Sequence, residues 1–98
     1  MEKSQALESL DELRAYVHRT LCERENLVEE QFAMRESSLV MYGAACGLQF
    51  MIHGPRSTRL SAVWAADPNV VYFYDASGER FLKVRLNERF AWGAPVAA

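Results

Sequence analysis

The fold is decided by residues 57–86, STRLSAVWAADPNVVYFYDASGERFLKVRL. Two turn signals divide this stretch, Asp67-Pro68-Asn69 and the five residues 75–79, DASGE. The runs between them are rich in β-branched, aromatic and alternating residues, which predicts strands at 57–66, 70–75 and 80–86. Because the connections are short, we expect neighbouring strands to pair antiparallel as two consecutive β-hairpins.

The register of these hairpins decides which side chains share a face of the sheet. If Asp75 faces Glu79, Phe73 faces Phe81, and the 67–69 loop then sets Trp64 against Tyr72. One face is expected to collect Leu60, Ala62, Trp64, Val70, Tyr72, Leu82, Val84 and Leu86, extended by Leu48, Phe50 and Ile52. The other is expected to collect Met51, Val63, Ala65, Val71, Phe73 and Phe81, interleaved with Arg59, Ser61, Lys83 and Arg85. A one-residue slip in the 67–69 loop would exchange faces between the strands on its two sides.

The N-terminal half supplies a helix and two further strands. Apolar residues at three- and four-residue steps predict an amphipathic helix from Ser4, its expected N-cap, to about Arg24. Residues 25–36 are expected to form a charged connector, 37–42 and 47–53 to be strands, and 88–98 to be a C-terminal tail after a single domain, 1–87. The predicted fold class is therefore α+β, with one N-terminal amphipathic helix packed on a four- to five-stranded antiparallel meander sheet.

Composition indicates one folded domain. The chain has 98 residues, half of them apolar and 24% charged, which is typical of a globular domain and not of a disordered chain. It contains no apolar run of the roughly 20 residues needed to span a bilayer, and its start is polar. With two cysteines and no disulfide framework, we expect a cytoplasmic protein with reduced thiols.

No set of residues predicts a catalytic, metal or cofactor site. His18 and Cys22 stand four apart on the helix, which permits a thiol–imidazole contact, but no orienting third group accompanies them. A zinc site that combined them with Cys46 and His53 fails on distance, because seven residue-to-residue steps of about 3.3 Å along a strand place the latter two more than about 20 Å apart. The acidic residues of 23–36 fit a solvated connector. We expect no catalytic residue, no metal and no cofactor.

Function is predicted from the second face of the sheet. One helix covers only one face, and apolar side chains on the other predict a non-enzymatic module that forms a homodimer or binds a protein partner. The expected interface residues are Met51, Val63, Val71, Phe73 and Phe81, unless the tail covers them through Phe90 and Trp92.

The alternative is single-stranded nucleic-acid binding on the same face. Phe73 and Phe81 would stack on bases, and the candidate anion contacts are Arg56, Arg59, Lys83 and Arg85. The net charge of −2 disfavours nucleic acid as a partner. A third hypothesis, an enzyme dependent on Cys22, requires a reactive thiol, and no membrane contact is expected.

Overall fold

Helix α1 (Leu10–Arg24) begins five residues later than the sequence pattern predicts. Ser9 is the N-cap, because its side chain accepts a hydrogen bond from the backbone N–H of Glu12 at 3.1 Å. The Glu12 carboxylate also accepts from the backbone N–H of Glu8 at 3.2 Å, which ties the residue before the cap to the first turn of the helix. This capping frees residues 2–5 from the helix, and they form strand β1 (Glu2–Gln5).

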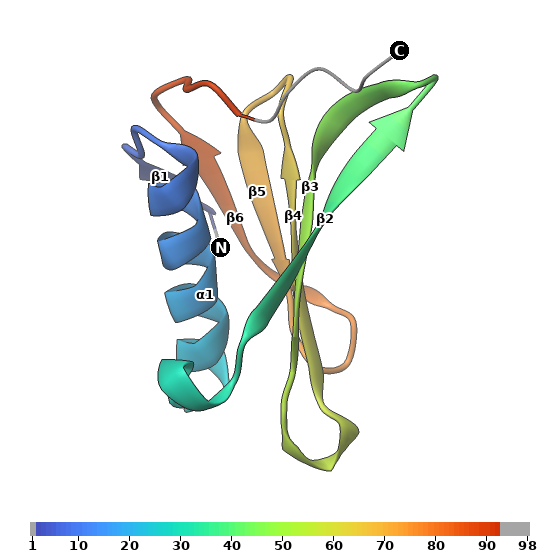
Figure 1. Cartoon of the computed structure of the whole chain (residues 1–98). Helices are drawn as coiled ribbons and strands as arrows, with labels where there is room; N and C mark the ends of the chain where they lie inside the picture. Colours follow the sequence, from blue (N-terminus) through green and yellow to red (C-terminus); the bar gives the residue numbers. More distant parts are fainter. Residues whose placement is uncertain (1, 93–98) are drawn as a thin grey trace.

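The computed structural model describes residues 2–92 of the chain and contains a six-stranded sheet (Figure 1). The sheet comprises β1, β2 (Met34–Met41), β3 (Ala44–His53), β4 (Arg59–Ala65), β5 (Val70–Tyr74) and β6 (Arg80–Leu86). Its strand order is β1-β6-β5-β4-β3-β2, with β1 parallel to β6 and all other pairs antiparallel. The α+β class and the meander are confirmed, and the strand count of four to five is corrected to six.

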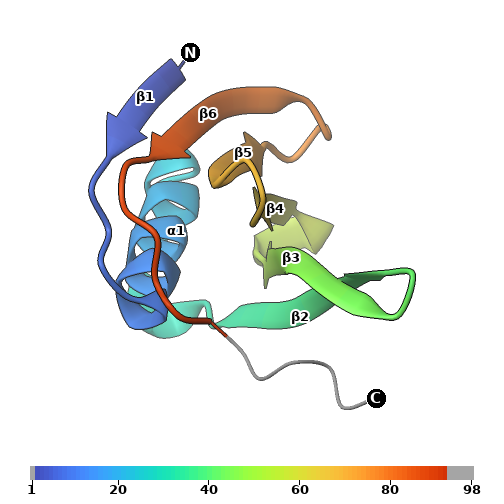
Figure 2. The same ribbon diagram turned by 90° about the horizontal axis from the view of Figure 1, so that it is seen from above.

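The sheet curves around the helix (Figure 2). Short 3-10 turns, η1 (Glu29–Gln31) and η2 (Pro55–Ser57), lie before β2 and between β3 and β4. The helix buries Leu13, Val17, Leu21 and Cys22 against the inner side of the sheet. Within residues 2–92, no helix has the length and apolarity required to cross a membrane.

Strand β5 is turned over relative to the prediction. The loop before it has four residues, because Asn69 adopts a left-handed φ of 57° and its backbone N–H bonds to Ala66 O at 3.1 Å. Val70 therefore pairs with Ala65, and Trp64 pairs with Val71, not with Tyr72. This is the one-residue slip that exchanges faces.

A second one-residue shift after β5 restores the register of β6. Asp75 faces Glu79 as predicted, and Gly78 holds a φ of 87° in the turn. The pairing then shifts between Phe73 and Tyr74, so that Phe73 pairs with Leu82 and not with Phe81. The two shifts compensate, and β4 and β6 present the predicted faces while only β5 is reversed.

The expected placement of Val71 and Phe73 is therefore wrong. Both are fully buried on the helix side, and the Tyr16 ring of α1 meets Phe73 edge-on with centroids 6.2 Å apart. Phe81, the extra residue of the bulge, is half-buried at the end of the helix, where the Arg24 guanidinium lies 4.5 Å above its ring. Neither ring faces away from the helix.

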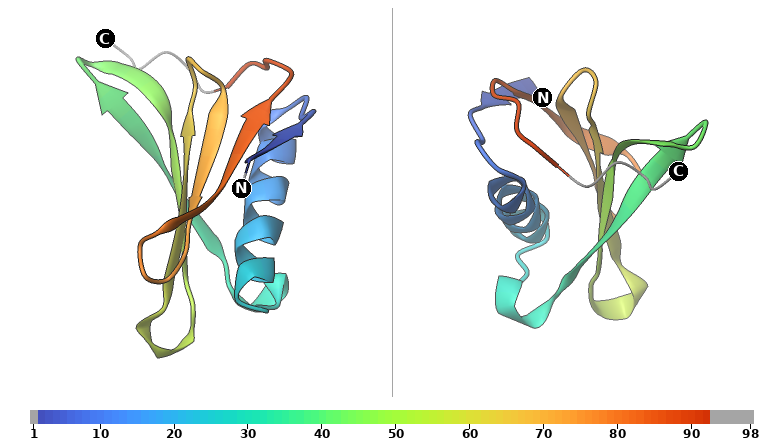
Figure 3. Two further views of the ribbon diagram at one scale, coloured as in Figure 1. Left: turned by 180° about the vertical axis from the view of Figure 1, so that it is seen from behind. Right: turned by 45° about the horizontal axis from the view of Figure 1, so that its top comes forward.

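The C-terminal segment also packs on the helix side (Figure 3). Phe90 stacks on Trp64 at a centroid distance of 5.3 Å, and Trp92 meets the same indole edge-on at 4.8 Å. The expected anchoring of the tail by these two residues is observed, but on the opposite face from the one it was expected to cover. Positions 93–98 of the expected tail lie outside the described residues.

Candidate ligand-binding face

The side of the sheet opposite α1 carries side chains in rows that the strand register defines. We call this surface the open face. Its first row runs across five strands and comprises Arg35, Met51, Ser61, Tyr74 and Arg80. The second row comprises Ser37, Gln49, Val63, Tyr72, Lys83 and Glu2, and the pair His53–Arg59 lies beside the first. The third row comprises Leu39, Gly47, Ala65, Val70, Arg85 and Ser4.

Two tyrosines lie at the centre of the open face because β5 is reversed. Tyr72 and Tyr74 alternate with the buried Val71 and Phe73, and both are partly exposed. The Arg80 guanidinium lies 5.3 Å and the Lys83 ammonium 6.0 Å from the centroid of the Tyr72 ring. Cations at this distance are attracted to the π face of the ring. Positive charge therefore lies beside the two tyrosines.

The charge of the open face is opposite to that of the whole chain. Five of its strand positions are basic (Arg35, Arg59, Arg80, Lys83 and Arg85), and Glu2 is the one carboxylate among its described positions. Glu2 lies at the β1 edge, 3.6 Å from Lys83 and 3.8 Å from Arg85. Among residues 2–92, basic side chains of this face without a carboxylate partner within 4.0 Å are therefore Arg35 and Arg59, toward β2–β4, and Arg80.

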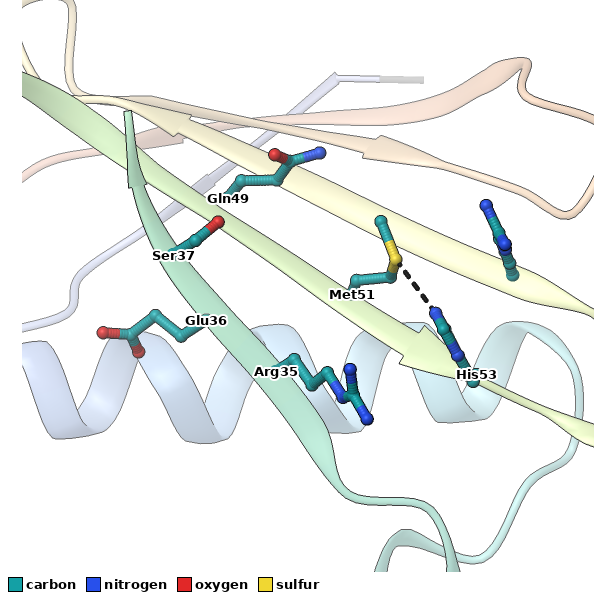
Figure 4. Close-up of a pocket in the computed structure, with 7 residues that line it drawn as sticks. Arg35, Glu36, Ser37, Gln49, Met51 and His53 are labelled. Atoms are coloured by element: carbon teal, nitrogen blue, oxygen red, sulfur yellow. Dashed lines mark hydrogen bonds between the residues drawn. The ribbon is translucent and has the colours of Figure 1, made fainter. Parts of the chain in front are cut away.

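A hollow of about 420 Å³ lies on this positive part of the face (Figure 4). It is lined by Arg35, Glu36, Ser37, Gln49, Met51, His53 and Arg59. His53 Nε2 lies 3.2 Å from the sulfur of Met51, and Figure 4 shows the two side chains pointing toward one another. Guanidinium, imidazole, hydroxyl and amide groups beside a thioether suit an anionic ligand that also has an apolar part.

Glu36 does not cancel this charge, because its carboxylate points to the other side of the sheet. It accepts hydrogen bonds from Nε of Arg14 at 2.6 Å and from a terminal guanidinium nitrogen at 3.0 Å. This two-point contact with α1 raises the pKa of Arg14 further above its ordinary value. The alternation of β2 thus sends Glu36 to the helix while Arg35 and Ser37 face the hollow.

The residues predicted for the site fall into three groups. Met51, Val63, Arg59, Lys83 and Arg85 lie on the open face as expected. Arg56 is exposed in the η2 turn, with a left-handed φ of 59°. Val71, Phe73 and Phe81 lie on the helix side, so the apolar centre of the predicted interface is not on the open face.

Tyr72, Tyr74, Arg35, Arg80 and His53 were not predicted as site residues. Arg35 belongs to a stretch, 25–36, that reads as a connector because its charges obscure the alternation. If the loop before β5 had been predicted to be one residue longer, the same alternating pattern would have placed Tyr72 and Tyr74 on the open face. The signal for the longer loop was Asn69, because asparagine tolerates the left-handed backbone conformation better than most residues.

The surroundings of Cys22, which is 1% exposed, disfavour the thiolate that a Cys22–His18 dyad requires. Burial of the Cys22 thiol, and after it the nearby carboxylates Glu29 and Glu30, raises its pKa. His18 Nε2 lies 2.7 Å from Phe32 O and so ties the connector to the helix. Among residues 2–92 there is no group of three or more His, Cys, Asp or Glu residues placed to hold a metal ion.

Comparison of the chain with protein-family models, with curated proteins and with solved structures returned no match.

Proposed function

We propose that the open face binds single-stranded nucleic acid, with Tyr72 and Tyr74 stacking on bases and Arg35, Arg59 and Arg80 contacting phosphates. The observation that carries this proposal is the charge of the face: five basic positions surround two tyrosines and oppose one edge carboxylate, in a chain of net charge −2. Stacking platforms beside cations are the usual means by which sheets bind single strands without sequence preference.

The spacing of the tyrosines supports this role. They are two residues apart on one strand, so their Cα atoms are about 6.6 Å apart along it and each ring has room for its own base. The helix and the described part of the C-terminal segment lie on the other side of the sheet, which leaves the tyrosines accessible. Homodimerisation centred on Phe73 and Phe81 has no comparable support, because both rings pack on the helix side.

The test is fluorescence anisotropy with a labelled 12-residue oligo-dT across a series of salt concentrations. For single strands, the logarithm of the affinity falls with slope of about −0.7 per phosphate contact. We expect a slope between about −2, for three arginines, and about −3.5, if Lys83 and Arg85 also contribute. Unchanged anisotropy up to about 100 μM protein at low salt would overturn the proposal.

Variants locate the contact on the open face. Tyr74→Ala should weaken binding by about five- to 150-fold, since stacking contributes about 1–3 kcal/mol per base. Arg35→Ala should weaken it and make the salt slope less steep by about 0.7. The matched control is Arg19→Ala, which removes the same charge from the exposed side of α1. Equal loss in Arg19→Ala and Arg35→Ala would refute a localised site.

A further inference from the structure

Three of the four exposed large apolar side chains among the described residues gather at one end of one strand. Val40, Met41 and Tyr42 lie at the end of β2 and in the turn that follows, with exposed fractions of 56%, 60% and 100%. Val28 is 50% exposed and lies six residues before the start of β2. Exposed apolar groups of this size in a soluble domain indicate a contact surface.

Strand β2 is also the unprotected edge of the sheet. It is the terminal strand next to β3, eight residues long, and within residues 2–92 no segment pairs with its outer side. The opposite edge, β1, has four residues, all polar or charged. A short polar edge resists further strand addition, whereas a long edge with apolar ends is a template for it.

We infer that two copies of this chain pair through their β2 strands, antiparallel about a twofold axis at Ser37, and form one continuous twelve-stranded sheet. If the twofold axis is perpendicular to the sheet, both open faces lie on the same side. One residue of β2 then lies directly opposite the same residue of the other copy. With Ser37 on the axis, Arg35 faces Leu39 and Glu36 faces Ser38, so no like charges are opposed. An axis at Glu36 would set two carboxylates against each other.

This register also brings the apolar ends of the two strands together. Val40 faces Met34, which is partly buried beside the core, and β2 ends at Met41, because Tyr42 turns the chain with a left-handed φ of 55°. The contact occurs twice, once at each end of the paired strands, as a twofold interface demands. A second copy is therefore the occupant that the edge fits, because each end of β2 complements the other end and not itself.

Pairing through β2 involves a different surface from the proposed nucleic-acid contact and does not depend on it. If both hold, the pairing places two open faces side by side and the two Arg35 side chains about 13 Å apart along the strands. The dimer would then bind a longer strand than one copy does. Failure of oligonucleotide binding leaves the dimer unaffected, and a monomer can still bind through its own tyrosines.

Sedimentation equilibrium at 10–100 μM tests the association. We expect twice the chain mass of 11.2 kDa. Val40→Lys should raise the dissociation constant at least tenfold, whereas Ala15→Lys, an exposed control on α1, should leave it unchanged. A wild-type chain that stays monomeric throughout this range would overturn the inference.

A cysteine cross-link tests the register of the paired β2 strands. The background for this test is Cys46→Ser, which removes the exposed native thiol. Directly opposed residues of antiparallel strands have Cα atoms about 4.5–5.5 Å apart, within the range that a disulfide spans. Ser37→Cys should therefore form an intermolecular disulfide under mild oxidation, and Ser77→Cys, in the exposed turn after β5, should not. Equal cross-linking of the two variants, or none in Ser37→Cys, would refute the pairing.

Discussion

Asn69 is the residue on which the reversal of β5 depends, and replacing it with alanine tests that dependence. It is buried, with 4% exposed, and holds a left-handed φ of 57°. Its side-chain oxygen accepts from Trp64 Nε1 at 2.9 Å, and its amide nitrogen donates to Glu88 O at 2.8 Å. The side chain therefore joins β4 to the segment that leaves β6.

The expected cost follows from these contacts. Asn69→Ala leaves the buried indole N–H and the Glu88 carbonyl without partners, and a buried polar group left unpaired costs about 1–3 kcal/mol. The left-handed backbone adds about 1 kcal/mol for alanine. We expect Asn69→Ala to lower the free energy of unfolding by about 3–5 kcal/mol, a large part of the 5–15 kcal/mol typical of a domain.

Asn26 provides a matched control, because it has a φ of 56° but is exposed. Asn26→Ala should cost about 1 kcal/mol, since it bears the backbone cost without buried partners. Asn69→Gly separates the two contributions, because glycine relieves the backbone cost and leaves the hydrogen bonds unmade. Its cost should stay at about 2–4 kcal/mol.

The assay is urea unfolding followed by far-UV circular dichroism, with Trp fluorescence as a second probe. For an m-value of about 1–3 kcal/mol/M, the midpoint of Asn69→Ala should fall by roughly 2 M at constant m. If Asn69→Ala lost no more stability than Asn26→Ala, the assignment of the loop to a buried hydrogen-bond network would be wrong.

Three further outcomes follow from the packing and the titrating groups. Phe73→Ala should cost about 3–5 kcal/mol by urea unfolding because the ring is fully buried, whereas Tyr74→Ala on the open face should cost about 1 kcal/mol. In the folded protein at neutral pH, iodoacetamide should modify Cys46 and spare Cys22, whose pKa burial raises; mass spectrometry showing Cys22 modified first would contradict this. The Ser77 hydroxyl, then the backbone N–H groups and Arg24, lower the pKa of Asp75, so its contribution to stability is complete above its unfolded pKa and is lost as pH falls through the folded one. The urea midpoint of Asp75→Asn should accordingly fall less on acidification than that of the wild type.

The elements that follow from local pattern were predictable. The helical stripe through Leu13, Val17 and Leu21 and the alternation of β4 and β6 place the core without any long-range information. Strand β1 was not predictable in this way, because four polar residues carry no pattern and its parallel pairing with β6 joins the two ends of the domain. The register of β5 depended on one left-handed residue and one bulge, neither of which alternation reveals.

The same distinction between correct and incorrect strand register explains which site residues were predicted. Residues on strands whose register was right, such as Arg59 and Lys83, lie on the open face as predicted. Val71 and Phe73 exchanged faces with Tyr72 and Tyr74 because all four belong to β5. Arg35 was missed for a different reason, since β2 is an edge strand whose exposed residues have no apolar alternation to mark them.

The reversal of a single strand changes the kind of partner that the open face can accept. With Phe73 outward, the centre of this face would be apolar and best covered by protein. With Tyr72 and Tyr74 outward, each ring has a polar hydroxyl, and Arg80 and Lys83 lie beside Tyr72, so burial against an apolar protein surface would strip hydration from the cations. A partner that supplies negative charge and flat π surfaces removes that cost. The surface suited to an apolar protein contact is instead the C-terminal end of β2 and the turn after it, where Val40, Met41 and Tyr42 are exposed.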